Sequence, residues 1–325
     1  SNNLAILGVV RGFHGQRLHV ITQAIEHKAV LEVCEAAKDF GAEVTILPVD
    51  AKGRVGLDDL RRAIQPNTVL ISIMAANNEI GTVQPIAEIA GLCAEKKIVF
   101  HVDAAQGICK IGFDLAKTPI DMISISGHKI YGPKGVGALI VRKQNRSYDL
   151  KPLFFGGEQE NKLRPGTLNV PGIVGLGQAC AVPAEELLEE SRRLHAWREQ
   201  IRLEVVTRFP HVIFNGSVEH RLCNNLSFSI PGMHADDLAL NLWGVAFSSG
   251  SACNSGNPKP SHVLKALGLA DDLARATLRL GLGRFTTAEE VSTVTSKILK
   301  MLEKMTSPNK SESRTTLDNK SKSMI

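Results

Sequence analysis

The sequence is poor in aromatic residues and carries no long apolar run. Phe, Trp and Tyr make up 5% of the 325 residues, and the net charge is +5, with the basic residues scattered along the chain. A basic stripe interleaved with aromatic residues is typical of nucleic-acid binding, so we expect no nucleic-acid partner. No segment approaches the roughly 18 apolar residues of a membrane span, and no charged-then-apolar leader opens the chain, so we expect no membrane association.

The sequence also lacks paired cysteines. Six cysteines lie far apart, and no two of them form a C-x-x-C pair: Cys34, Cys93, Cys109, Cys180, Cys223 and Cys253. We therefore expect neither a disulfide framework nor a metal site. Cys34 and Cys93 fall on apolar positions of helical patterns, which predicts burial. Cys253 lies in SSGSACNSGNPKPS, whose Ser, Gly, Asn and Pro are typical of an exposed loop, so its thiol is expected to be accessible.

Runs rich in Val, Ile and Leu alternate with amphipathic helical patterns through the first half of the chain. This alternation predicts an α/β fold, a mostly parallel sheet flanked by helices. In such sheets ligands bind at the carboxyl ends of the strands. The polar clusters that follow the strands therefore mark a candidate site. The expected strands span 18–22, 43–49, 68–74 and 98–103, with helices at 28–41, 57–65 and 86–97.

Three regions are expected along the chain. Residues 1–190 form a large domain, and a long charged helix over about 180–208 leads out of it. Residues 191–305 form a smaller α+β domain that carries the Cys253 loop. Residues 306–325 are rich in Ser, Thr, Lys and Asn, and we expect this tail to be disordered because it cannot bury enough apolar surface to offset the entropy of ordering.

Lys129 stands where an apolar strand ends, in the segment SISGHKIYGPKGVGAL. A lysine that forms a Schiff base needs a neutral amine, which burial or neighbouring charge in a strand-end pocket favours. If the carbonyl partner is pyridoxal phosphate, the site also needs an acid, a stacking group, a donor to the ring oxygen and phosphate ligands. The strand ends supply these types: Asp103 as the acid, His27 over the ring, Asn78 and Gln106 toward the ring oxygen, and Ser126, His128 and Thr167 for phosphate.

Each of these residues also has a purely structural interpretation. Alone, Lys129 is a solvated surface residue, Asp103 caps the helix that follows it, and Ser126 closes a turn. His27 is then an ordinary residue at a helix N-terminus. The gathering of all the required types at successive strand ends favours the functional interpretation.

Seven motifs resemble, in order and spacing, those of the cysteine desulfurase family. They are IEHKAV, NNEIGTVQPI, HVDAAQ, SGHKIYGPKGVGAL, GGEQENKLRPGT, SSGSACNS and LRLGLGRFTT, between residues 2 and about 303. The family belongs to aminotransferase class V and has aminotransferase fold type I. The SSGSAC version resembles the housekeeping branch that serves iron–sulfur assembly. The resemblance implies a pyridoxal 5'-phosphate cofactor on Lys129, and a homodimer in which Thr167 reaches the phosphate of the partner subunit.

The resemblance also implies the reaction. Sulfur leaves L-cysteine, giving L-alanine and a persulfide on Cys253, which passes to an iron–sulfur scaffold or another sulfur-acceptor protein. Lys129 takes the α-proton, His27 acts as general acid and base on the substrate thiol, and the Cys253 thiolate attacks the sulfur. Arg279 holds the substrate carboxylate, unless it is a surface arginine of the small domain. The expected compartment is the cytoplasm, with an organelle matrix as the alternative.

Two other functions stay open. One is a different fold-type-I enzyme, such as a transaminase or a selenocysteine lyase, and the other is a truncated, non-catalytic chain that keeps only partner-binding surface. The family carries a Gly-Ala-Thr-Glu turn just before its paired asparagines, whereas this chain begins with SNN, so we expect a truncated N-terminus. Glu158, Asn161 and Lys162 stand where glycine, arginine and glycine are frequent, which changes the charge near the expected dimer interface.

Overall fold

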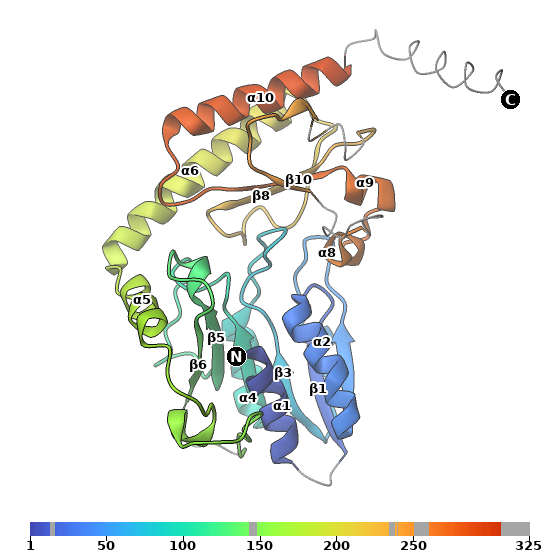
Figure 1. Ribbon diagram of the computed structural model, residues 1–325. Coiled ribbons are helices and arrows are strands. Elements are labelled where there is room, and N and C mark those ends of the chain that lie inside the picture. The colour runs from blue at the N-terminus through green and yellow to red at the C-terminus, as the bar shows by residue number, and fades with distance from the viewer. Residues whose placement is uncertain (14–16, 143–147, 234–237, 239, 250–259, 307–325) are drawn as a thin grey trace, which may run out of the picture.

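A six-stranded sheet forms the lower part of the molecule in the computed structural model (Figure 1). The structure describes residues 1–13, 17–142, 148–233, 238, 240–249 and 260–306. The strand order is β2-β1-β3-β4-β5-β6; the first five pair in parallel and β6 pairs antiparallel with β5. The expected mostly parallel α/β sheet is confirmed. Its strands are β1 Leu18–Gln23, β2 Ala42–Leu47, β3 Thr68–Ser72, β4 Val99–Asp103, β5 Met122–Ser126 and β6 Gly137–Val141.

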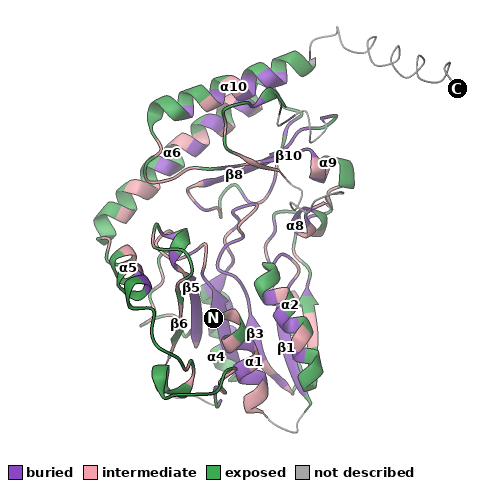
Figure 2. Cartoon of the chain, in the orientation of Figure 1, coloured by how far each residue is buried: buried purple, intermediate pink, exposed green. Residues whose placement is uncertain are grey.

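Helices cover both faces of this sheet, because successive residues of a strand point to opposite sides. Leu70 and Val99 enter a core with α1 and α2, whereas Ile71 and Phe100 enter a second core with α3 and α4. In Figure 1, α1 and α2 lie in front of the sheet and α4 lies behind it. The central strands are therefore buried on both faces, as Figure 2 shows for β3 and β5. The helices are α1 Asn2–Gly12, α2 Lys28–Ala37, α3 Leu57–Ala63 and α4 Ile86–Lys96.

The boundaries in the first half differ little from those expected. The helix expected over 28–41 leaves α-geometry at Ala37 and continues as the short 3-10 helix η1, Lys38–Phe40. Gly41 ends it with a φ of 85°, in the left-handed region that glycine adopts without strain. The strand expected over 68–74 ends at Ser72, although the Ile73 amide still donates to the His101 carbonyl of β4 at 3.1 Å.

A second, antiparallel sheet forms the upper part, in the order β7-β8-β10-β9. The long helices α6 and α10 pack on it, and Phe228, Leu278, Ile201 and Ile298 are buried in the core between them. Its strands are β7 Ile213–Phe214, β8 Asn225–Ser229, β9 Ser248–Ser249 and β10 Thr277–Gly281. The remaining elements are α5 Val170–Cys180, α6 Ala184–Arg208, α8 His262–Ala266, α9 Asp271–Arg275, α10 Ala288–Thr306, η2 Gly127–Lys129 and η3 Gln159–Lys162.

The connection between the two sheets is longer and more broken than a single helix. The helix expected over about 180–208 begins at Ala184, because Pro183 takes the N-cap position, and α5 precedes it as a separate helix. Since α6 runs through residue 190, the domain boundary expected there stays a prediction. Residues 307–325, nearly all of the predicted tail, lie outside the described residues. Among the helices that are described, none is long and apolar enough to cross a bilayer.

Candidate active site

The strand-end segments meet at one edge of the large sheet. Strands β1, β3, β4 and β5 are neighbours, so the residues that follow them share the edge that faces the second sheet (Figure 1). Asp103 ends β4, and its carbonyl accepts a hydrogen bond from the Ala75 amide at 2.8 Å. On its other side, the Ala104 amide donates to the Ser124 carbonyl at 2.9 Å. The fold thus places this edge where the sequence predicted a ligand site.

Asp103 holds a buried and oriented carboxylate at this edge. Its Oδ2 accepts a hydrogen bond from Asn2 Nδ2 at 2.8 Å, and its Oδ1 accepts one from the Ala105 amide at 2.9 Å. The second bond caps a turn after β4, whereas the structural interpretation of Asp103 expected a helix there. The first fixes the carboxylate from a helix that lies far away in sequence. The α-amino group of Ser1 also interacts electrostatically with this carboxylate.

Lys129 ends the short helix η2 at the edge of a cavity of about 550 Å³. Its side chain is exposed, and among the described residues its amino group makes no hydrogen bond or ion pair. The preceding turn is organised by a 3.1 Å contact between Ser126 Oγ and His128 Nδ1. The cavity is lined by Gln106, Lys110, His128, Lys129, Tyr131, Asn224, Gly281, Leu282, Gly283, Arg284, Phe285, Thr286 and Glu290.

A second lysine borders the same cavity. Lys110 Nζ donates hydrogen bonds to the backbone carbonyls of Lys129, at 3.2 Å, and Gln106, at 3.5 Å. Burial is the main cause that lowers the pKa of Lys110, and the neighbouring Lys129 charge also lowers it. The Lys110 amine therefore stabilises the turn at Lys129 through its hydrogen bonds to backbone carbonyl oxygens.

Arg279 and Asn78 are brought together from different sheets. Arg279 lies on β10 of the upper sheet, and its Nη1 donates to the Asn78 carbonyl oxygen at 3.1 Å. Both residues are partly buried. The candidate carboxylate-binding residue thus lies against the segment that follows β3, at the ligand-facing edge of the large sheet.

His27 is the N-cap of α2, and its Nδ1 accepts a hydrogen bond from the Ala29 amide at 3.1 Å. This is the structural interpretation given to His27 above, and it leaves the ring exposed at the edge. The preceding residue, Glu26, is fully buried. Its Oε1 accepts from the Met74 amide at 2.6 Å and from Gln23 Nε2 at 2.8 Å, and its Oε2 has no partner among the described residues. Burial raises the pKa of Glu26 to about 8, and the charge of Asp103 adds to the rise.

Two predicted site residues are not joined to this edge in the described chain. Thr167 is exposed, and its backbone carbonyl accepts a hydrogen bond from Arg164 Nη1 at 3.4 Å; no described hydrogen bond links it to Ser126 or His128. Cys253 lies within residues 250–259, outside the described residues. Of the other cysteines, Cys34 and Cys93 are buried as expected, and burial raises the pKa of each to about 12.

Comparison with known proteins assigns the chain to a family. The model of the family described as aminotransferase class-V matches residues 1–294. The chain belongs to this family. It is 44% identical over 307 residues to the cysteine desulfurase of Homo sapiens, covering 94% of this chain and 66% of that protein. It is 46% identical over 313 residues to the mitosomal cysteine desulfurase of Trachipleistophora hominis, covering 94% of this chain and 70% of that protein.

Solved structures of class-V relatives share this architecture. A NifS-like protein superposes with a TM-score of 0.84 at 36% identity, covering 93% of this chain and 80% of that one. The structure of SspA in complex with cysteine superposes with a TM-score of 0.74 at 40% identity, covering 88% and 80% of the two chains. The chain spans 66% and 70% of the length of the two cysteine desulfurases, and 80% of each of the two solved chains.

The structure adds cavity residues that the sequence did not single out. Lys110, Tyr131 and Arg284 border the cavity at Lys129. Glu26 is buried near the carboxyl ends of the strands of the large sheet. Tyr131 and Arg284 lie within motifs that carried the resemblance, so the sequence could have indicated them as site residues. The burial of Glu26 and Lys110 depends on segments far away in sequence, and no local pattern indicates it.

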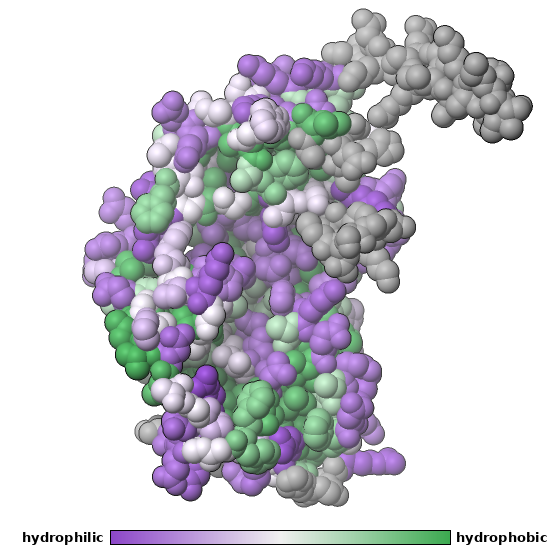
Figure 3. Space-filling view, viewed as in Figure 1, coloured by the Kyte–Doolittle hydropathy of each residue, from purple (hydrophilic) through white to green (hydrophobic). Residues whose placement is uncertain are grey.

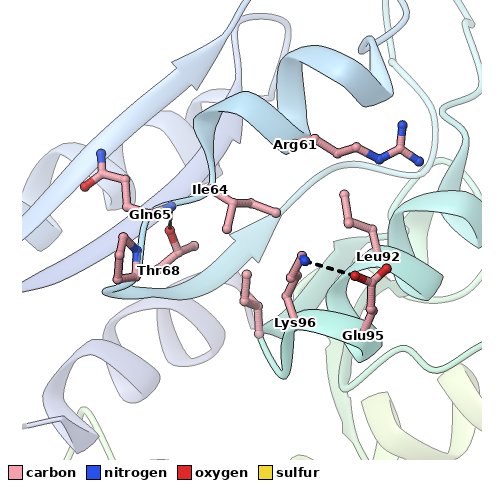
Figure 4. Close-up of a pocket in the computed structure, with 9 residues that line it drawn as sticks. Arg61, Ile64, Gln65, Thr68, Leu92, Glu95 and Lys96 are labelled. Atoms are coloured by element: carbon pink, nitrogen blue, oxygen red, sulfur yellow. Dashed lines mark hydrogen bonds and ion pairs between the residues drawn. The ribbon is translucent and has the colours of Figure 1, made fainter.

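Another cavity of about 550 Å³ lies at the opposite end of the large sheet. It opens near the beginning of β3, between α3 and α4, where Lys96 forms an ion pair with Glu95 at 2.9 Å (Figure 4). Thr68 borders it, and its hydroxyl is already bonded to His19 Nδ1 at 2.7 Å. This cavity lies away from the carboxyl ends of the strands, where ligands bind in such sheets, so we do not place the candidate active site there.

Proposed function

We propose that this chain is a cysteine desulfurase, which transfers sulfur from L-cysteine to one of its own thiols and releases L-alanine. The observation that carries the proposal is the strand-end lysine Lys129, which borders a cavity at the same sheet edge as the buried carboxylate of Asp103. The relatives named cysteine desulfurases, and a related structure in complex with cysteine, support the same reaction.

The residues at the edge fit pyridoxal phosphate by their chemistry. Asp103 offers a buried carboxylate for a protonated pyridine nitrogen, and Ser126 and His128 offer a hydroxyl and an imidazole for a phosphate. Asn78 and Gln106 supply amides that can donate to the ring oxygen. When bound, this cofactor supplies an electron sink for the charge that develops at the α-carbon of the substrate.

Protein residues then bind the substrate and move its protons. Arg279 binds the carboxylate of L-cysteine, because a guanidinium fork donates two parallel hydrogen bonds to a carboxylate. Lys129 holds the cofactor before the substrate arrives and afterwards takes the proton from the α-carbon. His27, exposed at the edge, exchanges the proton of the substrate thiol.

Cys253 receives the sulfur. Its thiolate attacks the substrate sulfur, so that a sulfur–sulfur bond forms as the carbon–sulfur bond breaks. The bond electrons stay on the substrate β-carbon, which takes up one proton to become the methyl group of L-alanine, and the α-carbon regains the proton that Lys129 removed. L-cysteine and the Cys253 thiol thus yield L-alanine and a Cys253 persulfide with no external oxidant or reductant.

A homodimer completes the proposed site. Exposed apolar side chains precede and follow Thr167 along the chain, namely Phe154, Phe155, Val170 and Val174, and green atoms gather over α5 in Figure 3. Burial of such a surface stabilises association. Because Thr167 is itself exposed, we propose that it serves the phosphate site of the partner subunit. We also propose that the boundary between the large domain and the smaller α+β domain lies near residue 190.

The persulfide passes to an iron–sulfur scaffold or another sulfur-acceptor protein. Relatives with mitosomal and mitochondrial names support an organelle matrix as the compartment, with the cytoplasm as the alternative.

Purified chain loaded with pyridoxal phosphate tests the reaction. With L-cysteine and a thiol reductant, we expect L-alanine and sulfide in equal amounts, without any added keto acid. A transaminase would instead need a keto acid acceptor and would release no sulfide. A chain that carries the cofactor on Lys129 and releases no alanine contradicts the proposed function.

A further inference from the structure

Tyr131, two residues after Lys129, has an uncommon backbone conformation. Its φ is 66°, in the left-handed region that disfavours bulky side chains. Such a residue persists only when its surroundings hold it. The contacts of the Tyr131 side chain therefore show which residues hold this backbone conformation.

The Tyr131 side chain is held by the turn at residues 283–286. Its hydroxyl oxygen accepts a hydrogen bond from the Arg284 amide at 2.7 Å. The Arg284 guanidinium lies over its ring, 4.6 Å from the centroid, and the Phe285 ring meets it edge to face at 5.9 Å. Three contacts thus join the Lys129 turn to a turn of the upper sheet.

Helix α6 holds the same turn through Glu190. Glu190 Oε2 accepts from Arg284 Nε at 2.7 Å in a partly buried ion pair, with side chains 17% and 28% exposed. Glu190 Oε1 lies 3.5 Å from the Tyr131 hydroxyl. Arg193, one turn further along α6, donates to the Arg284 carbonyl at 2.8 Å. Three separate segments therefore converge on one cluster, which we call the 131/190/284 cluster after Tyr131, Glu190 and Arg284.

The cluster connects the chain segments that carry two residues of the proposed mechanism, Lys129 and Arg279. Tyr131 belongs to the turn of Lys129, and Arg284 follows β10, which carries Arg279. Tyr131 and Arg284 also line the cavity at Lys129. The position of Arg279 relative to Lys129 depends on how the turn after β10 sits against the turn after β5, and the cluster joins these two turns directly.

We propose that Tyr131, Glu190 and Arg284 are positioning residues that hold the Arg279 strand in register with the Lys129 turn. The cluster acts on the reaction through these two residues, and this part of the inference rests on the proposed function. Displacing a carboxylate-binding arginine by a fraction of an ångström weakens the alignment of the substrate with the base. Breaking the cluster is therefore expected to disturb both turns together, although each variant changes only one segment.

Hydrogen–deuterium exchange tests this without relying on turnover. Glu190→Gln keeps the shape and removes the charge, and Tyr131→Phe removes only the hydroxyl. We expect each to speed exchange in residues 127–135 and in residues 281–287 by roughly tenfold, because each loosens a contact that both segments share. Asp271→Asn, which removes the exposed ion pair between Lys265 of α8 and Asp271 of α9, is the control and leaves both segments unchanged.

Turnover gives the second readout. In the cofactor-loaded chain, Glu190→Gln is expected to raise the KM for L-cysteine several-fold, while borohydride still fixes the cofactor on Lys129. The variant Glu190→Arg with Arg284→Glu restores the ion pair with exchanged charges, and it is expected to recover part of the slow exchange. Faster exchange confined to the substituted segment, or no change in either variant, overturns the inference. A wild-type chain without alanine release refutes the proposed function but leaves the exchange result decisive for the cluster.

Discussion

Arg279 Nη1 lies 3.1 Å from the backbone carbonyl oxygen of Asn78, and this hydrogen bond joins the two sheets of the molecule. The two residues are 201 positions apart in sequence, on β10 and on the segment that follows β3. The bond uses one nitrogen of the guanidinium and fixes the side chain at the ligand-facing edge. The remaining donors are then available for a carboxylate.

This geometry makes a prediction for Arg279→Lys. Lysine keeps the charge and loses the planar fork, so it cannot bind the Asn78 carbonyl and a bidentate carboxylate together. We expect kcat/KM for L-cysteine to fall by on the order of tenfold to a hundredfold, mainly through a higher KM. Steady-state alanine release measures this. A fall in kcat alone would place the arginine outside substrate binding.

The two lysines of the cavity predict different outcomes on reduction. The Lys129 amine has no hydrogen-bond partner among the described residues, whereas the Lys110 amine is bonded to two backbone carbonyls. Borohydride treatment of the loaded chain should therefore fix pyridoxal phosphate on the peptide that contains Lys129. The adduct should be absent from Lys129→Ala and present in Lys110→Met, as mass spectrometry of the digest can establish. An adduct on Lys110 in the wild-type chain would reassign the reactive lysine.

Glu26 predicts a pH dependence of stability. Its pKa is about 8 in the folded chain, against 4.5 for the ordinary side chain, so between these pH values the folded chain holds a proton that the unfolded chain has lost. The contribution of this residue to stability is therefore lost as pH rises through that window, by on the order of 1 kcal/mol per pH unit.

Glu26→Gln removes this titration, because glutamine stays neutral. The free energy of unfolding of the wild-type chain should fall relative to Glu26→Gln as pH rises from about 4.5 to about 8. Denaturant unfolding at several pH values measures the difference. Glu32→Gln, a change on the exposed face of α2, is the control and should run parallel to the wild type. If the Glu26→Gln profile also runs parallel, Glu26 is ionised in the folded chain.

Much of the fold was predictable from local patterns. Alternating apolar runs and amphipathic helices indicate β1 to β4 and α2 to α4, because the hydrophobic periodicity of each element is visible within a short segment. The strand-end positions of His27, Asp103 and Lys129 follow from the same reading. The charged pattern that begins at Ala184 indicates α6, whereas the shorter helix α5 before it was not predicted.

The remainder depends on contacts between distant segments. Nothing near Tyr131 in the sequence indicates that Arg284 covers its ring, and nothing near Glu26 indicates that its carboxyl group is buried under Met74. Thr167 shows a different limit. Its predicted role needs a second subunit, so a single chain cannot bring it to Ser126 and His128.

The central claim is that Cys253 takes the sulfur after Lys129 has removed the α-proton. Cys253→Ala should lower alanine release from L-cysteine by on the order of a hundredfold or more, because the nucleophile is removed. It should keep much of any release from selenocysteine, since a selenol leaves carbon more readily than a thiol. Lys129→Ala should lose both activities. Cys223→Ala, which removes a half-buried thiol whose pKa is raised by burial, is the control and should retain cysteine turnover.

The most direct measurement is mass spectrometry of the loaded wild-type chain after a brief exposure to L-cysteine, without reductant. The account predicts one additional sulfur atom on the peptide that contains Cys253, in proportion to the L-alanine released. Alanine release with the added sulfur on another cysteine, or with no protein-bound sulfur at all, would contradict it.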